Sequence, residues 1–180
     1  GYQALKTLNA GADGFNTAVG YLAGTALTTG VQNTLIGADA GLSMTDAILN
    51  VGVGYQALYS ETSGRKSVGI GYGALFTQNT TTNTDVFNIG IGHYAGGSMT
   101  TGQYNTIIGG LAGDALTTGA NNVAVGYEAL STEDAHGDNV AVGYRALKAL
   151  NAGADSFNTA VGYLAGTNMT TGLENAILGS

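Results

Sequence analysis

The stretches "NVAVGYEAL" at residues 122–130 and "NVAVGYRAL" at residues 139–147 differ at one position and begin 17 residues apart. Copies of this unit start at Asn16, Asn33, Asn50, Ser67, Asn88, Asn105, Asn122, Asn139, Asn158 and Asn175. The spacings are 17, 17, 17, 21, 17, 17, 17, 19 and 17 residues. This period is too short for helical-hairpin repeats of about 33 to 47 residues and for leucine-rich repeats. It predicts one turn of a β-solenoid per unit.

Each unit, called a rung below, is numbered from place 1 at its opening Asn or Ser. Places 2 to 4 hold β-branched or small apolar residues, as in residues 17–19 and 106–108, which predicts one short strand. A polar turn such as "TTG" closes each rung, and no helical periodicity is present. We therefore predict an all-β, parallel β-solenoid of about ten rungs of 17 to 21 residues, with the longer spacings explained by inserted loops.

Three places predict ladders of stacked side chains or backbone. The amides at place 1 are expected to occupy a left-handed corner and to bond to one another, as in an Asn ladder; they are Asn16, Asn33, Asn50, Asn88, Asn105, Asn122, Asn139, Asn158 and Asn175. The glycines at place 5 permit close backbone approach or a bend; they are Gly20, Gly37, Gly54, Gly71, Gly92, Gly109, Gly126, Gly143 and Gly162. Tyrosines at place 6 are expected to stack; they are Tyr21, Tyr55, Tyr72, Tyr127, Tyr144 and Tyr163.

Each rung also keeps one large apolar side chain for a narrow core. Four rungs carry it at place 9, as Leu58, Leu75, Leu130 and Leu147; rungs with Gly there carry it at place 12, as Leu27, Met44, Met99, Leu116 and Met169. Places 2, 4 and 6 share one strand face and places 3 and 5 the other, and neither face is charged. We expect the coil interior to cover one face and another copy of the chain the other.

Composition excludes several functions. The 180 residues include 5 Lys and Arg against 12 Asp and Glu, for a net charge of -7, which argues against a nucleic-acid or anionic-membrane footprint. The chain has no Cys, and no apolar run approaches the roughly 18 residues of a membrane span. We expect no cofactor and no membrane insertion in this segment.

The sequence motifs give little support to an enzymatic function. Gly52, Gly54 and Ala57 have the spacing of a dinucleotide-binding loop, but that loop must join a strand to a helix, and no helix is expected. His93 stands where other rungs have Tyr and is expected to pack or lie at the solvent edge. No Ser-His-Asp arrangement recurs, so we expect no catalytic residues and no enzyme.

The segment "STEDAHGD", residues 131–138, is the one place that resembles a metal site. Glu133, Asp134, His136 and Asp138 supply carboxylate and imidazole groups within one turn. A solvated polar turn is the alternative that we favour, because the corresponding "LTTG" turns have no such ligands. We therefore predict no metal and keep these four residues as the candidate.

The tandem "NTAVGYLAG" and "NVAVGYEAL" units resemble the head repeats of trimeric autotransporter adhesins, and more closely the repeats of bacterial and phage tail-fibre-domain proteins. The resemblance covers residues 1–180 as one repetitive segment. It implies a left-handed parallel β-roll, three chains packed around one axis, and adhesion or receptor contact. Rungs of 17 residues or more are longer than the roughly 14 of that family.

We therefore predict a structural and adhesive segment of a longer fibre, extracellular, on a cell surface or on a virion. Its partners would be further copies of itself and an unidentified host receptor, glycan or surface, presented with the turns at residues 79–85 and 133–138. An ice-binding β-solenoid is the alternative, prompted by Thr pairs such as Thr28-Thr29 and Thr117-Thr118, although rungs such as "YSETSG" interrupt the array. A filament of subunits stacked end to end is a further alternative.

Overall fold

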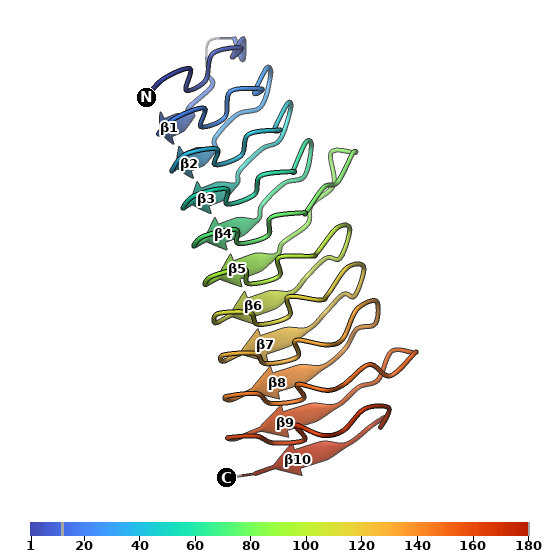
Figure 1. Cartoon of the computed structure of the whole chain (residues 1–180). Helices are drawn as coiled ribbons and strands as arrows, with labels where there is room; N and C mark the ends of the chain where they lie inside the picture. The colour runs from blue at the N-terminus through green and yellow to red at the C-terminus, as the bar shows by residue number, and fades with distance from the viewer. Residues whose placement is uncertain (12, 180) are drawn as a thin grey trace.

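Ten strands of three residues form one sheet in the computed structural model, which describes residues 1–11 and 13–179. Their bounds are β1 Thr17–Val19, β2 Thr34–Ile36, β3 Val51–Val53, β4 Val68–Ile70, β5 Ile89–Ile91, β6 Thr106–Ile108, β7 Val123–Val125, β8 Val140–Val142, β9 Thr159–Val161 and β10 Ala176–Leu178. The strands follow chain order across the sheet, and all pairs are parallel. Figure 1 shows the resulting stack, with the termini at opposite ends.

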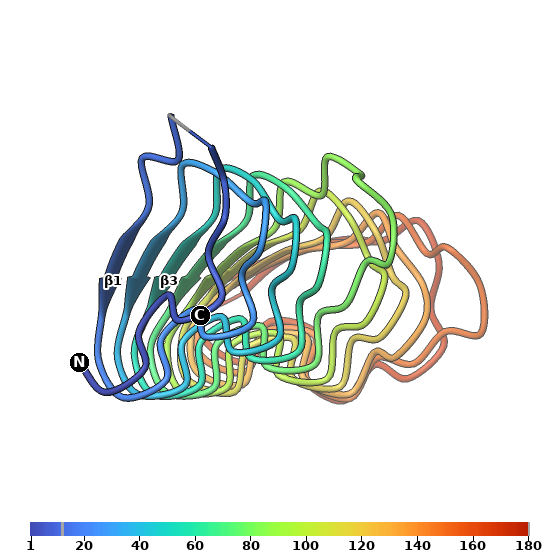
Figure 2. The same cartoon turned by 90° about the horizontal axis from the view of Figure 1, so that it is seen from above.

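The repeat and the coil coincide, because each residue of a strand pairs with the residue at the same place in the next rung. Thr17 pairs with Thr34 and Val123 with Val140, for example. Figure 2 shows the consequence from above, with strands aligned along one flank of the stack and turns along the other. The parallel β-solenoid is confirmed, and the described residues include no helix.

The return path of each rung, places 6 to 11, has no strand but is still hydrogen-bonded from rung to rung. Asp39 and Gly41, at places 7 and 9, have left-handed φ angles of 57° and 57°. Their N–H groups point in opposite directions: Asp39 donates to the Tyr21 carbonyl of the preceding rung at 2.8 Å, and Gly41 donates to the Ala57 carbonyl of the following rung at 2.9 Å. The sequence did not reveal this second ladder, because half of the left-handed residues at place 9 are Leu, a residue that rarely adopts this conformation.

One predicted feature of the corner is wrong. The left-handed residue is the one before the ladder Asn, and the ladder Asn residues themselves are not left-handed. Phe15 (φ 45°), Leu49 (φ 62°) and Tyr104 (φ 60°) turn the chain, and the following Asn is thereby aimed into the coil. Backbone hydrogen bonds to the neighbouring rung hold these bulky residues in place, such as Tyr104 N–H to the Val86 carbonyl at 2.9 Å.

The core is a single narrow column inside the coil. The predicted exchange between places 9 and 12 holds in most rungs, since Leu58, Leu75, Met44 and Leu116 are all fully buried. The eighth rung is an exception, because it buries a Leu at both places, Leu147 and Leu150. The residue at place 3 of each strand faces the same column, and its size varies from rung to rung with the space that the neighbouring core side chains leave. A Cβ on Gly90 would lie 2.7 Å from Leu75 Cγ, so the Leu side chain occupies the space that Gly leaves.

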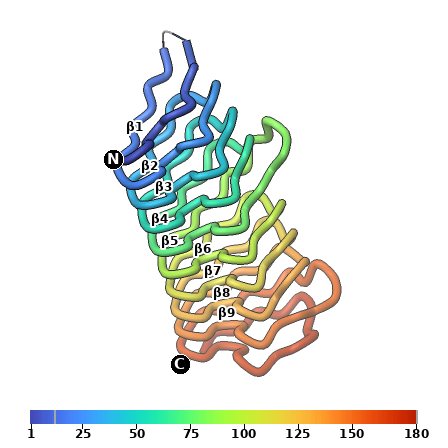
Figure 3. Tube along the Cα trace, turned by 45° about the horizontal axis from the view of Figure 1, so that its top comes forward, coloured from blue at the N-terminus to red at the C-terminus, as the bar shows by residue number. Residues whose placement is uncertain are grey.

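The two insertions form loops, as predicted. Figure 3 shows the chain between β4 and β5 and between β8 and β9 projecting beyond the other turns. The first loop is attached by an ion pair between Lys66 and Asp85 at 2.7 Å and by a β-bridge between Arg65 and Asp85. Residues 81–83 at its tip are exposed.

Candidate functional site

The Asn ladder runs inside the coil and closes each rung. Asn105 shows the geometry: its Nδ2 donates to the Gly119 carbonyl at 2.9 Å, at the far end of the same rung, and its Oδ1 accepts from Asn122 N–H at 2.9 Å in the next rung. The predicted amide-to-amide bond is also present, from Asn105 Nδ2 to Asn88 Oδ1 at 3.2 Å. Each buried amide therefore joins two parts of one rung to the following rung.

Ser67 interrupts this ladder, and a buried network replaces the missing amide. Gln78 Nε2 donates to Ser67 Oγ at 3.0 Å, and Gln78 Oε1 accepts from Asn88 Nδ2 at 2.9 Å. The same Nε2 donates to Glu61 Oε2 at 2.8 Å. Glu61 and Gln78 both stand at place 12 in the core, where sequence reasoning did not expect polar side chains. The signal was available: both rungs already carry a core Leu at place 9, so place 12 was free to hold another residue type.

The Gly ladder and the aromatic ladder also match the predictions. The place 5 glycines have φ between 129° and 140°, and a Cβ on Gly109 would meet the backbone carbonyl of Gly126. Tyr72 stacks on His93 with ring centroids 5.3 Å apart, and Tyr144 stacks on Tyr163 at 5.3 Å. The aromatic ladder is broken where Ala38 and Gly110 occupy place 6. His93 is exposed in this stack, as predicted.

The outer face of β1–β10 is a continuous surface without charge. Places 2, 4 and 6 carry Thr, Val, Ile, Tyr and other uncharged residues, and many of these side chains are exposed in the single chain. The exposed ones include Val19, Ile36, Ile70, Val161, Tyr21, Tyr55, Tyr72, Tyr127, Tyr144 and Tyr163. Contiguous apolar surfaces of this kind mark interaction sites in soluble proteins.

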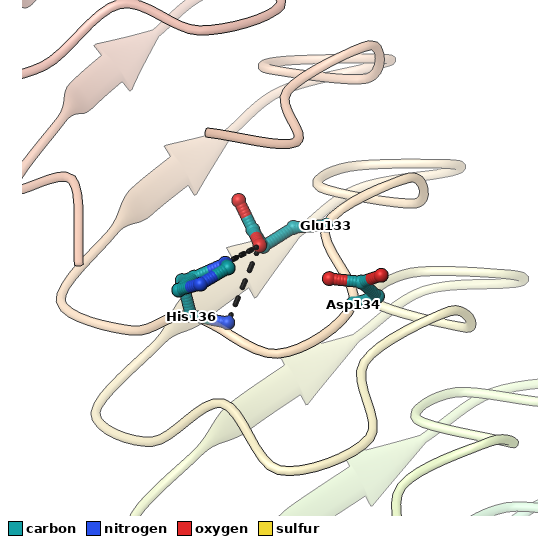
Figure 4. Close-up of side chains that lie close together, drawn as sticks. All are labelled: Glu133, Asp134 and His136. Carbon is teal, nitrogen blue, oxygen red and sulfur yellow. Dashed lines mark hydrogen bonds and ion pairs between the residues drawn. The ribbon is translucent and has the colours of Figure 1, made fainter. Parts of the chain in front are cut away.

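The structure brings three of the four candidate metal ligands together. Ligand atoms of Glu133, Asp134 and His136 all lie within 4.8 Å of one another (Figure 4). Asp138 is not part of the cluster, and its Oδ1 accepts from Asn121 Nδ2 at 3.3 Å. The interpretation of this segment as a fully solvated turn is wrong for Glu133, which is completely buried at place 12 of its rung. Asp134 is exposed and His136 half-buried.

A shallow pocket opens on the return path where Gly97 separates two larger residues. Phe76 and Asp114 stand at the same place of the adjacent rungs, and Tyr94 and Leu111 complete the walls of a space of about 360 Å³. Asp114 Oδ1 is buried without a hydrogen-bond partner, and burial raises the pKa of its carboxyl above the ordinary value.

The threonines at place 13 form a further ladder on the turn flank. Three of these hydroxyl groups donate to the backbone carbonyl at the same place of the next rung, from Thr28 at 3.0 Å, from Thr100 at 3.1 Å and from Thr117 at 2.7 Å. Asn79, Asp134 and Asn151 interrupt the column. These hydroxyl protons are engaged with the backbone, which weakens the ice-binding alternative.

Comparison with protein-family models, curated proteins and solved structures found no match for this chain. Among the described residues, no helix has the length and apolar character needed to cross a membrane.

Proposed function

We propose that this chain is a stiff structural and adhesive fibre segment that functions as a homotrimer. The observation that carries the proposal is the uncharged outer face of β1–β10, which repeats the same places along ten rungs. A sheet face of Val, Ile and Tyr gains free energy on leaving water, at about 25 cal/mol per Å² of apolar surface. Another copy of the chain presents the same places at the same spacing, which makes it a suitable cover.

Stiffness follows from three sets of hydrogen bonds between rungs. Each rung is joined to the next by strand pairing, by the return-path hydrogen bonds and by the Asn amides, with Gln78 replacing the amide that is missing at Ser67. In such one-dimensional stacks each rung is supported by its neighbours, so bending requires several bonds to break together. The left-handed coil and the trimer axis belong to this proposal through the resemblance to trimeric adhesin heads and tail-fibre repeats.

The adhesive surface would be the turn flank, which lies opposite the sheet in Figure 2. The loop at residues 79–85 projects beyond the other turns (Figure 3), and both this loop and the turn at residues 133–138 differ from the other turns in sequence. These turns are the parts that would contact a receptor, a glycan or a surface outside the cell or virion. Ice binding and end-to-end filament growth are the competing functions.

Light scattering of the purified chain tests the assembly directly. The proposal expects a particle of about 54 kDa, three chains of 18.0 kDa. A stable particle of 18.0 kDa would contradict it and make ice binding, measured as thermal hysteresis, the next function to test. A broad distribution of masses that grows with concentration would instead favour the end-to-end filament.

A further inference from the structure

The turn of the seventh rung departs from its sibling turns at three places at once. Place 12 holds Leu or Met in most rungs but Glu133 here; place 13 holds Thr in most rungs but Asp134 here; place 15 holds Gly in most rungs but His136 here. Each departure introduces a carboxylate or an imidazole, the side-chain groups that bind Zn²⁺ through oxygen and nitrogen. The three new ligand atoms lie within 4.8 Å of one another, from a buried, an exposed and a half-buried side chain.

Glu61 shows what a buried carboxylate at place 12 needs when it stands alone. Its Oε1 accepts from the N–H groups of its own turn at 2.9, 3.2 and 2.7 Å and from the N–H and hydroxyl of Thr80 at 3.1 and 3.0 Å. Gln78 binds its other oxygen at 2.8 Å. Six donors therefore compensate for the burial of this carboxylate, as buried charge requires.

Glu133 occupies the same place without that set of donors. Its Oε1 accepts from His136 N–H at 3.3 Å and faces His136 Nδ1 at 3.1 Å, and its Oε2 accepts from Ala152 N–H at 3.3 Å. Half as many partners at longer distances compensate less well for a buried charge. In place of the missing donors the turn supplies an imidazole and a second carboxylate.

The distances suit one metal ion held by the three side chains. Ligands bound to Zn²⁺ at 2.0–2.2 Å in a tetrahedron lie about 3.3 Å apart, close to the spacing of Glu133 Oε1 and His136 Nδ1. Asp134, across the turn in Figure 4, is exposed and can rotate to give the third ligand, with water as the fourth. We propose that Glu133, Asp134 and His136 form a binding site for one divalent transition-metal ion. The imidazole favours Zn²⁺ over Ca²⁺ and Mg²⁺, which take oxygen ligands.

Calorimetric titration of the whole chain with zinc chloride tests this site. We expect one Zn²⁺ per chain and no heat from calcium chloride. Asp134→Thr and His136→Gly restore the residues of the sibling turns and should preserve the fold. Each should weaken Zn²⁺ binding by more than about 10-fold, the smallest loss expected from disturbing even an outer partner of a metal ligand.

His93→Tyr is the matched control, because it removes the other histidine and restores the place 6 residue found in most rungs. This variant should bind Zn²⁺ like the parent chain. Thermal unfolding without and with Zn²⁺ gives a second readout, since a ligand that binds only the folded chain raises the Tm. An absence of Zn²⁺ binding by the parent, or equal binding by a folded Asp134→Thr variant, would overturn the proposal. Either result is independent of the mass found by light scattering.

Discussion

At the residue scale, the buried amides at place 1 contribute more than their size suggests, because one side chain such as that of Asn105 makes three hydrogen bonds away from water. Asn105→Ala would leave the Asn122 N–H and the Gly119 carbonyl without their side-chain partners in the core. Unsatisfied buried groups cost about 1 to 3 kcal/mol each, so the two groups together predict a loss of about 2 to 6 kcal/mol in the free energy of unfolding. Chemical denaturation measures it. Asn151→Ala, at an exposed Asn whose side chain is outside the ladder, is the control and should change stability little.

The glycines at place 5 cannot be replaced by other residues without strain, because of their backbone geometry. Gly109 combines a φ of 136° with a Cβ position that is blocked by the Gly126 carbonyl. Gly109→Ala should therefore cost about 3 kcal/mol or more and, in thermal unfolding, lower the Tm strongly. The neighbouring Gly110 offers a matched control, since its nearest contact would be Tyr127 Cδ2 at 3.5 Å. If Gly110→Ala destabilised the chain as much as Gly109→Ala, the close rung-to-rung approach would not explain the ladder.

At the scale of one rung, Gln78 compensates for the Ser at place 1. Gln78→Leu would give this rung the apolar place 12 of its siblings but remove the hydrogen bond to Glu61 Oε2 and one of the two acceptors of Asn88 Nδ2, which would keep the Gly102 carbonyl. We expect a loss of about 1 to 3 kcal/mol. Ser67→Asn should recover part of that loss in the Gln78→Leu background by restoring the ladder amide. A double-mutant cycle measured by denaturation should show coupling of about 0.5 to 3 kcal/mol, and strict additivity would contradict the assignment.

The rung was largely predictable, and the exceptions have physical reasons. The positions of the strands, the inserted loops and the exchange of core residues between places 9 and 12 could be predicted, because similar residue types recur at the same places of each rung. The conformation of the return path could not be predicted, because residues such as Leu58 and Leu130 adopt positive φ only when the neighbouring rungs accept hydrogen bonds from their N–H groups. The burial of Glu133 was missed for a related reason: charge indicates solvent exposure unless the rung alignment shows that the residue occupies a core place.

At the scale of the whole molecule, we predict that one charged substitution on the outer face of β1–β10 dissociates the trimer without unfolding the chain. Ile70 ends β4 and is exposed on this face, so Ile70→Lys adds a charge where the single chain tolerates it. In a trimer built on this face the ammonium would lose its water, and burying an unpaired ion costs several kcal/mol. Light scattering should then give a mass near 18.0 kDa for the variant, with unchanged circular dichroism.

Thr132→Lys supplies the comparison, because Thr132 is exposed on the turn flank of the same stack. The added charge is identical, so general repulsion between chains changes equally in both variants, and only the place of the charge differs. We expect Thr132→Lys to retain the mass of the parent chain. If the parent is trimeric and Ile70→Lys is trimeric too, the outer face of β1–β10 is not the interface, and the assembly proposed on this face is wrong.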